Sequence, residues 1–166
     1  MVELSYNKNK SIDVDNKSGF DKRQWVKLVN CLSGAKSANL IATVSGDGMT
    51  NLAMISSVFH LGADPPLMGF VLRPHALESP RHTLLNIVDT DCFTINHVNE
   101  AIYKKAHQTS ARYDRAQSEF SMCGLTEVFK DFFKAPYVAE SHLQNCLLYT
   151  SPSPRDQRGS RMPSSA

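Results

Sequence analysis

Residues 51–60 read NLAMISSVFH and are followed by DPPLMGFVLRP at 64–74, SPRHTLLNI at 79–87 and FTIN at 93–96. This order predicts a strand, a loop with two prolines, a second strand, a short helix and a third strand. The helix signal is Ser79 before Pro80, because serine caps helices and proline suits their first turn. A helix N-terminus presents free N–H groups and a positive dipole end, so this start, with Arg81 and Thr83 beside it, predicts a phosphate site.

The size and composition of the chain limit what this stretch belongs to. The 166 residues are 42% apolar, which fits one domain with one core, and the formal charge of +2 does not favour a nucleic-acid partner. No apolar run is long enough to cross a bilayer, and the polar first 16 residues do not resemble a signal peptide. Four widely spaced cysteines without a Cys-x-x-Cys pair indicate buried thiols in a reducing, cytoplasmic setting.

Working outward, the patterns predict the remaining elements in order. Residues 1–17 are expected to be a flexible N-terminal arm, and apolar residues at helical spacing predict a helix over 21–32 whose apolar face covers a sheet. A Ser-Gly-Asp-Gly turn at 45–48 predicts a hairpin between 38–44 and 49–59. The further expected elements are a strand at 67–72 covered on both faces, a helix from 79 to about 90, a strand at 92–98, helices at about 99–107 and 114–120, and a strand at 125–129.

Strands that pair with sequence neighbours, with helices added at the edges, indicate a mainly β protein. The chain contains neither G-x-G-x-x-G nor G-x-x-x-x-G-K-[ST], so a nucleotide-binding parallel α/β sheet is not expected. We therefore predict an antiparallel barrel with helical additions.

Several short motifs together resemble one family. They are KSANLI at 36–41, NLA and SSV within 51–58, HLGADPP at 60–66, GF through RP at 69–74, RHT and NI within 81–87, TINHV at 94–98, AHQTSA at 106–111, EF at 119–120 and GLT at 124–126. In this order and spacing, over about residues 24–146, the chain resembles the flavin reductase-like, FMN-binding split-barrel proteins.

The resemblance implies a fold, a cofactor and an activity. Members of this family are six-stranded split barrels that form homodimers, bind FMN near the dimer interface and often reduce flavin with NADH or NADPH. An isoalloxazine ring needs backbone donors and acceptors along its polar edge, an apolar surface under its face and a cationic pocket for its phosphate. The pattern does not distinguish NADH from NADPH.

The resemblance also implies a set of FMN-binding residues. Residues 51–59 would follow the edge of the ring, with the Ser56 and Ser57 hydroxyls near ring or ribityl oxygens, although two serines can also simply end a strand. Arg73, Arg81 and Thr83 would meet the phosphate, solvated surface arginines being the alternative. Residues 106–111 would lie beside the ring, where a capped helix end is the alternative. The candidate FMN-binding residues are Asn51, Met54, Ser56, Ser57, Arg73, Arg81, Thr83, Thr109 and Ser110.

No catalytic acid or base and no metal site are predicted. Direct hydride transfer from a nicotinamide to a flavin requires stacked rings and stabilisation of negative charge, not an ionisable side chain. His97 and His107 lack a third residue at metal-ligand spacing.

The end of the sequence departs from the family pattern. Residues 148–166 are rich in Ser, Pro and Arg without periodicity, which predicts a disordered tail that resembles a translated adaptor sequence, a regulatory tail being the alternative. The split-barrel domain, residues 18–147, would then be truncated, because family members continue through further strands. The missing strands would leave an unpaired sheet edge and weaken FMN binding.

Three interpretations follow. The first is an NAD(P)H-dependent flavin reductase, the second a non-catalytic FMN-binding electron carrier of the flavoredoxin type, and the third a truncated fragment with impaired flavin binding. Turnover of NADH with free FMN, a tightly held flavin reduced only by a partner protein, or a colourless protein not stabilised by FMN would distinguish them.

Overall fold

The structure, a computed structural model, describes residues 3–5, 11–13, 19–64, 66–72 and 81–148. The chain divides into two compact units, residues 1–36 and 37–166, which are described separately. The predicted domain boundaries, after residues 17 and 147, stay predictions.

The first unit contains a short strand pair and a helix. Strands β1 (Glu3–Ser5) and β2 (Ser11–Asp13) pair antiparallel within the segment predicted as an arm. Helix α1 (Lys22–Cys31) confirms the helix expected at 21–32. Its start is fixed by a capping box, in which the Gln24 N–H donates to Asp21 Oδ1 at 2.8 Å and the Asp21 N–H donates to Gln24 Oε1 at 3.0 Å.

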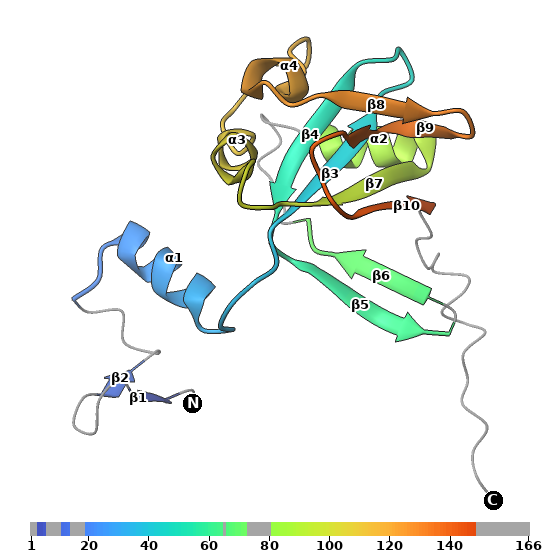
Figure 1. The fold of residues 1–166 in the computed structure, drawn as a ribbon. Helices are drawn as coiled ribbons and strands as arrows, with labels where there is room; N and C mark the ends of the chain where they lie inside the picture. Colours follow the sequence, from blue (N-terminus) through green and yellow to red (C-terminus); the bar gives the residue numbers. More distant parts are fainter. Residues whose placement is uncertain (1–2, 6–10, 14–18, 65, 73–80, 149–166) are drawn as a thin grey trace, which may run out of the picture. The chain divides into compact units, whose positions relative to one another are not determined.

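The second unit is built on a four-stranded antiparallel sheet in the order β10-β7-β3-β4 (Figure 1). Strands β3 (Asn39–Val44) and β4 (Thr50–Ile55) form the predicted hairpin, with Val44 opposite Thr50. Gly48 has φ +87° in the connecting turn, a conformation that favours glycine. Strands β7 (Cys92–His97) and β10 (Gln144–Leu148) complete the sheet.

Each face of this sheet is covered by its own group of apolar side chains. Side chains alternate along a strand, so Leu40 and Ala42 of β3 face one side and Ile41 faces the other. On the first side they pack with residues of the later helices, including Phe120, and on the second with Ile87. Burial on both faces explains why β3 is buried along its whole length.

Two further hairpins accompany the sheet. Strands β5 (Val58–Ala63) and β6 (Pro66–Phe70) pair with each other, as do β8 (Glu127–Lys130) and β9 (Phe133–Val138). Buried hydrogen bonds connect β9 to the sheet: the Val138 N–H donates to Asn96 Oδ1 at 3.0 Å, and Thr94 Oγ1 donates to the Pro136 carbonyl at 2.6 Å. The sheets are not closed into a continuous barrel.

Three helices flank the sheet. Helix α2 (His82–Thr90) packs Ile87 against the sheet, while α3 (Tyr103–Gln108) and α4 (Glu119–Cys123) contribute Ala106 and Phe120 to the opposite face. None of the helices within the described ranges combines the length and apolarity that spanning a membrane requires.

Some expected bounds were wrong. The strand expected over 49–59 is broken at Ser56 and Ser57, where the chain leaves the sheet and starts β5. The strand expected at 67–72 lies at 66–70 as β6 and is exposed or half-buried rather than covered on both faces; among the described strands it pairs with β5 alone. The N-cap of α2 is Arg81, whereas the Ser79 and Pro80 signal lies outside the described residues. Helices α3 and α4 begin three or more residues later than expected.

Candidate functional site

A polar cavity of about 480 Å³ lies beside β4, the start of α2 and the segment after α3. The volume falls in the range that small-molecule and cofactor sites occupy. The residues lining this polar cavity are Asn51, Ala53, Met54, Ile55, Leu72, Arg81, His82, Thr83, Thr109, Ser110, Ala111, Arg112 and Glu119.

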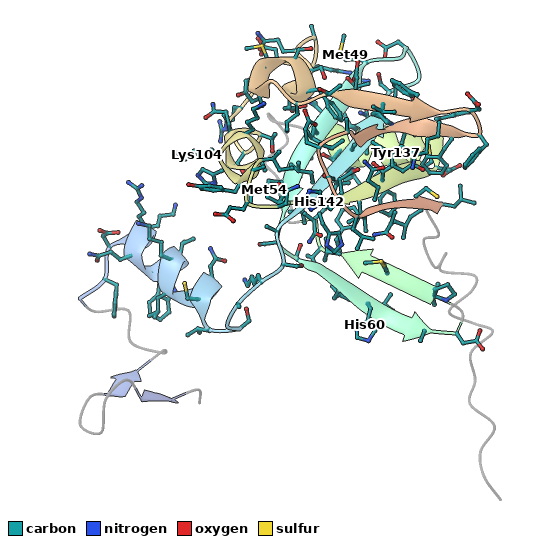
Figure 2. The ribbon with its side chains drawn as sticks, viewed as in Figure 1. Met49, Met54, His60, Lys104, Tyr137 and His142 are labelled. Carbon is teal, nitrogen blue, oxygen red and sulfur yellow. The ribbon has the colours of Figure 1, made fainter. Side chains whose placement is uncertain are left out.

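Strand β4 supplies one wall of the polar cavity and ends the described part of its sheet, with β3 as its only neighbour there. The Leu52 N–H points away from β3, because it donates to Glu119 Oε2 at 2.9 Å. Along an antiparallel strand the backbone groups point alternately to either side, so the N–H and C=O of Met54 also lie on the outer edge of β4. Met54, labelled in Figure 2, is half-buried and lines the polar cavity. This wall therefore combines free backbone groups with an apolar side chain.

The start of α2 supplies a second wall. Arg81 is the N-cap and is exposed, with no hydrogen bond from its side chain to the cap, so its guanidinium is free of a capping role. The N–H groups at the first helical positions, His82 and Thr83, have no partner within an α-helix and carry the positive end of its dipole. Arg81 and these N–H groups make this end of the polar cavity suitable for an anion.

A buried hydrogen bond joins these two walls. Asn51 Nδ2 donates to Thr83 Oγ1 at 3.1 Å, and both residues are at least nine-tenths buried. The bond fixes the first turn of α2 against β4. A ligand that contacts both walls therefore meets groups already held in position, which lowers the entropic cost of binding.

The third wall comes from the chain between α3 and α4. Thr109 is buried at the C-terminal end of α3 and its hydroxyl donates to the Ala106 carbonyl at 2.8 Å. Ser110 and Arg112 are exposed and line the polar cavity. Arg112 adds a second guanidinium to that of Arg81.

Glu119 is the one carboxylate among the described residues that line the polar cavity. It is 7% exposed, and burial raises the pKa of its carboxyl, opposed by the Leu52 N–H, by its own backbone N–H and by His82. Helix α4 is held to β4 nearby, because the Ser118 and Thr50 hydroxyls are hydrogen-bonded at 2.7 Å.

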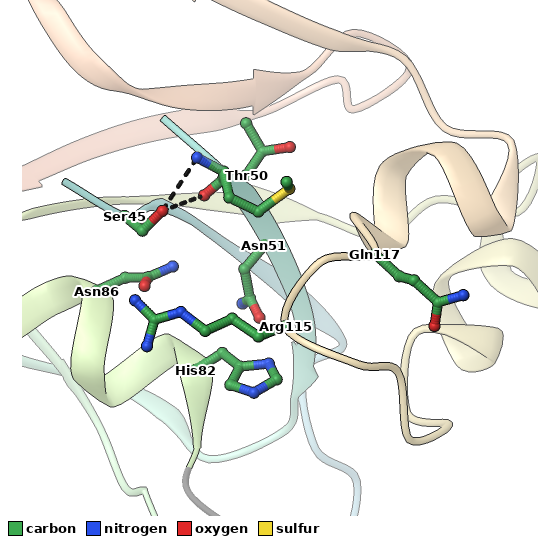
Figure 3. Close-up of a pocket in the computed structure, with 8 residues that line it drawn as sticks. Ser45, Thr50, Asn51, His82, Asn86, Arg115 and Gln117 are labelled. Atoms are coloured by element: carbon green, nitrogen blue, oxygen red, sulfur yellow. Dashed lines mark hydrogen bonds between the residues drawn. The ribbon is translucent and has the colours of Figure 1, made fainter. Parts of the chain in front are cut away.

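A second, small cavity of about 10 Å³ adjoins the polar cavity, since Asn51 and His82 line both. Figure 3 shows the Arg115 side chain extending across Asn51 toward Asn86, with His82 beside it. Its volume suits about one water molecule. The small cavity therefore has no room for a larger ligand, but its Arg115 adds positive charge next to the polar cavity.

The polar cavity brings together six of the nine predicted site residues: Asn51, Met54, Arg81, Thr83, Thr109 and Ser110. Ser56 and Ser57 are not among the lining residues. Ser57 Oγ donates to the Val71 carbonyl at 2.9 Å and accepts from the Val71 N–H at 3.2 Å, so its hydroxyl joins the chain after β6 to the start of β5. Arg73 lies outside the described residues. The FMN-binding roles of all nine stay predictions.

Sequence reasoning missed Arg112, His82 and Glu119 as cavity residues. Arg112 directly follows the segment 106–111 that was expected beside the ring, and His82 lies between the predicted residues Arg81 and Thr83. The family motifs could therefore have indicated both. Glu119 belongs to the EF motif at 119–120, but that motif indicated no place in a cavity, because a glutamate after a serine also fits an ordinary helix start. Its place in the cavity depends on how α4 packs against β4.

Comparison with known proteins identifies the class of this domain. Residues 33–145 match the model of the flavin reductase like domain, and the chain belongs to that family. A solved structure with a split barrel domain from Shewanella frigidimarina NCIMB 400, proposed to be a flavin reductase, is 50% identical with a TM-score of 0.75, covering 80% of this chain and 65% of that one.

Two further proteins are more distantly similar, one in structure and one in sequence. Flavoredoxin of Desulfovibrio vulgaris (Miyazaki F) is 22% identical with a TM-score of 0.64, covering 73% of this chain and 63% of that chain. A protein of Aquifex aeolicus (strain VF5) described as uncharacterized is 29% identical over 124 residues, 74% of this chain and 63% of its own. The chain thus spans somewhat under two thirds of the length of these relatives. Its fold is the mainly antiparallel split barrel of flavin reductases.

Proposed function

We propose that the polar cavity binds FMN and that the protein is an NAD(P)H-dependent flavin reductase. The observation that carries this proposal is the joining of the cationic start of α2 to the outer edge of β4 in one cavity. An FMN molecule has one end that needs cations and N–H donors and another that needs backbone groups beside an apolar surface.

Each part of the cavity has a role in this proposal. Arg81 and the N–H groups of His82 and Thr83 hold the phosphate, where charge-assisted hydrogen bonds are the strongest available. The backbone of Met54 on the outer edge of β4 pairs with the polar edge of the ring. Thr109 and Ser110 lie beside the ligand and help to exclude water.

When bound, FMN supplies an acceptor for the two electrons of a hydride, which NADH or NADPH donates. The residues of the cavity contribute position and positive charge: Arg81 holds the phosphate, and Arg112 stabilises the negative charge that reduction places on the ligand. No side chain is assigned as a catalytic acid or base. The nicotinamide, the downstream acceptor and a homodimeric state of the longer protein belong to the same proposal. So does a cytoplasmic location, which fits the four free thiols.

The visible spectrum of the purified protein tests this function. The protein is mixed with FMN, excess ligand is removed, and NADH or NADPH is then added. Retained absorbance near the flavin bands, bleached by the nicotinamide, is the expected result. Retention without bleaching, except when a partner reductase is added, would favour the electron carrier. A colourless protein whose unfolding temperature does not rise with FMN would contradict flavin binding.

A further inference from the structure

Glu119 places a carboxyl group, which is negative when ionised, in a cavity that is otherwise suited to an anion. Among the described residues, the other charged side chains that line the polar cavity are those of Arg81 and Arg112, with the His82 imidazole beside them. A carboxylate among them opposes a phosphate or a reduced flavin, because like charges at short range repel strongly where water is excluded. The position of Glu119 therefore affects the ligand.

The carboxyl keeps its position in both charge states. Its Oε2 accepts the Leu52 N–H at 2.9 Å, and a carboxyl oxygen accepts such a bond whether the group is ionised or protonated. Phe120, the next residue of α4, is 1% exposed in the core, and Ser118 is bonded to Thr50. Protonation can therefore change the charge of the cavity without changing its shape.

The described neighbours of Glu119 include no lysine or arginine that interacts with its carboxyl. The groups that interact with it are His82 on α2, Tyr113 in the segment before α4 and Cys123 on α4 itself. Strands β3 and β4 contain no titratable residue. Among the described residues, no ion pair fixes Glu119 in its ionised form, and its burial favours the protonated one.

We propose that binding of an anionic flavin in the polar cavity is coupled to uptake of one proton by Glu119. The inference rests on the proposed function, since FMN is the ligand that brings the negative charge. Linkage gives the sign: below the pKa of Glu119 the group is neutral and FMN binds freely, whereas at higher pH ionised Glu119 opposes the ligand. FMN affinity should fall as pH rises through the range in which Glu119 ionises.

The test compares the protein with Glu119→Gln, in which the amide oxygen can still accept the Leu52 N–H while the charge is absent. Dissociation constants for FMN are measured by quenching of flavin fluorescence from pH 5.5 to 8.5. We expect a loss of affinity toward high pH that is greater in the wild type, on the order of tenfold, and tighter binding by the variant at pH 8.5. The phosphate of FMN titrates in both proteins, so only the difference between the profiles reports on Glu119.

Two controls separate charge from shape. Riboflavin lacks the phosphate, so the two proteins should bind it with nearly parallel pH profiles. Calorimetry of FMN binding in two buffers of different ionisation enthalpy measures net proton uptake, which includes the phosphate of FMN, so the difference between the wild type and Glu119→Gln gives the share of Glu119.

The outcomes distinguish this inference from the proposed function. Tight FMN binding with the same pH profile in both proteins, or with the same net proton uptake in both between pH 5.5 and 8.5, would overturn the coupling and leave flavin binding intact. Failure of both proteins to bind FMN at every pH would overturn the proposed function and the coupling together.

Discussion

Two cavities of similar size lie in the same unit and differ in chemistry. The polar cavity has a volume of about 480 Å³ and contains two arginines, a histidine and a glutamate. The other, here called the apolar cavity, has about 460 Å³ and is lined by Leu61, Leu67, Met68, Gly69, Phe70, Leu72, Leu84, Ile87, Phe93, Leu147 and Leu148. Volume alone would therefore not say which of them holds a phosphorylated ligand.

The difference follows from which parts of each element face the space. The polar cavity is lined by the N-terminal residues of α2 and by the outer edge of β4, where no described strand pairs with the backbone. The apolar cavity takes Leu84 and Ile87 from the same helix together with side chains of β5, β6 and β7. One helix thus offers its dipole and cation to one cavity and its apolar face to the other. Substitutions in the polar cavity should affect ligand binding, and those in the apolar cavity should affect stability.

The largest effect is expected for Phe93→Ala in the apolar cavity. Phe93 is 6% exposed and its ring meets that of Phe70 edge-on, with centroids 5.2 Å apart. Removing it should lower the free energy of unfolding by about 3 kcal/mol. Urea denaturation measures the change. The matched control is Phe129→Ala, because Phe129 is 52% exposed and its loss should cost less than about 1 kcal/mol. Equal losses in the two variants would contradict the role of this core.

The next effect is on binding and comes from Arg81→Ala in the polar cavity. Arg81 is exposed and its side chain makes no capping bond, so stability should hardly change. Loss of a charge-assisted contact to the phosphate should weaken FMN binding roughly tenfold to a hundredfold, with a smaller effect on the chemical step. The FMN dissociation constant, measured by fluorescence, checks this.

Leu61→Ser is the control for the arginine variant, since Leu61 lines the apolar cavity and is 65% exposed. It should leave FMN affinity unchanged. Equal FMN affinity in wild type and Arg81→Ala would refute the phosphate assignment.

A mixed effect is expected for Thr83→Val, which removes the hydroxyl that accepts from Asn51. A buried amide left without its partner should cost about 1–3 kcal/mol of stability, and loosening of α2 against β4 should also weaken FMN binding. Thr83→Ser keeps the hydroxyl and should preserve affinity better. Thermal unfolding without FMN measures the stability, and the rise in unfolding temperature with FMN reports the affinity. If neither changes in Thr83→Val, the bond between Asn51 and Thr83 does not organise the site.

The smallest effect is expected for Ser57→Ala. The two hydrogen bonds with Val71 predict a stability loss of about 1 kcal/mol, while FMN affinity should change by less than roughly threefold. A loss of affinity as large as that of Arg81→Ala would instead support the contact with the flavin that the family pattern implies for Ser57.

Much of the fold could be predicted because its signals are local. The turn at 45–48, the helix over 21–32 and the strand at 92–98 depend on residues near one another in the chain. The break of the long strand at Ser56 could not be read this way. It depends on β5 pairing with β6 instead of extending along β3, and both serines are compatible with either course.

For the candidate site, the sequence by itself determined the basic helix start, the polar residues of 51–57 and the family pattern that connects them to FMN, because each is written in contiguous residues. Only the tertiary structure decided that Asn51 bonds Thr83, that Ser57 turns to Val71, and that Glu119 enters the cavity through the edge of β4. These contacts join residues 14 to 67 positions apart, and packing of separate elements, not local preference, selects such pairs.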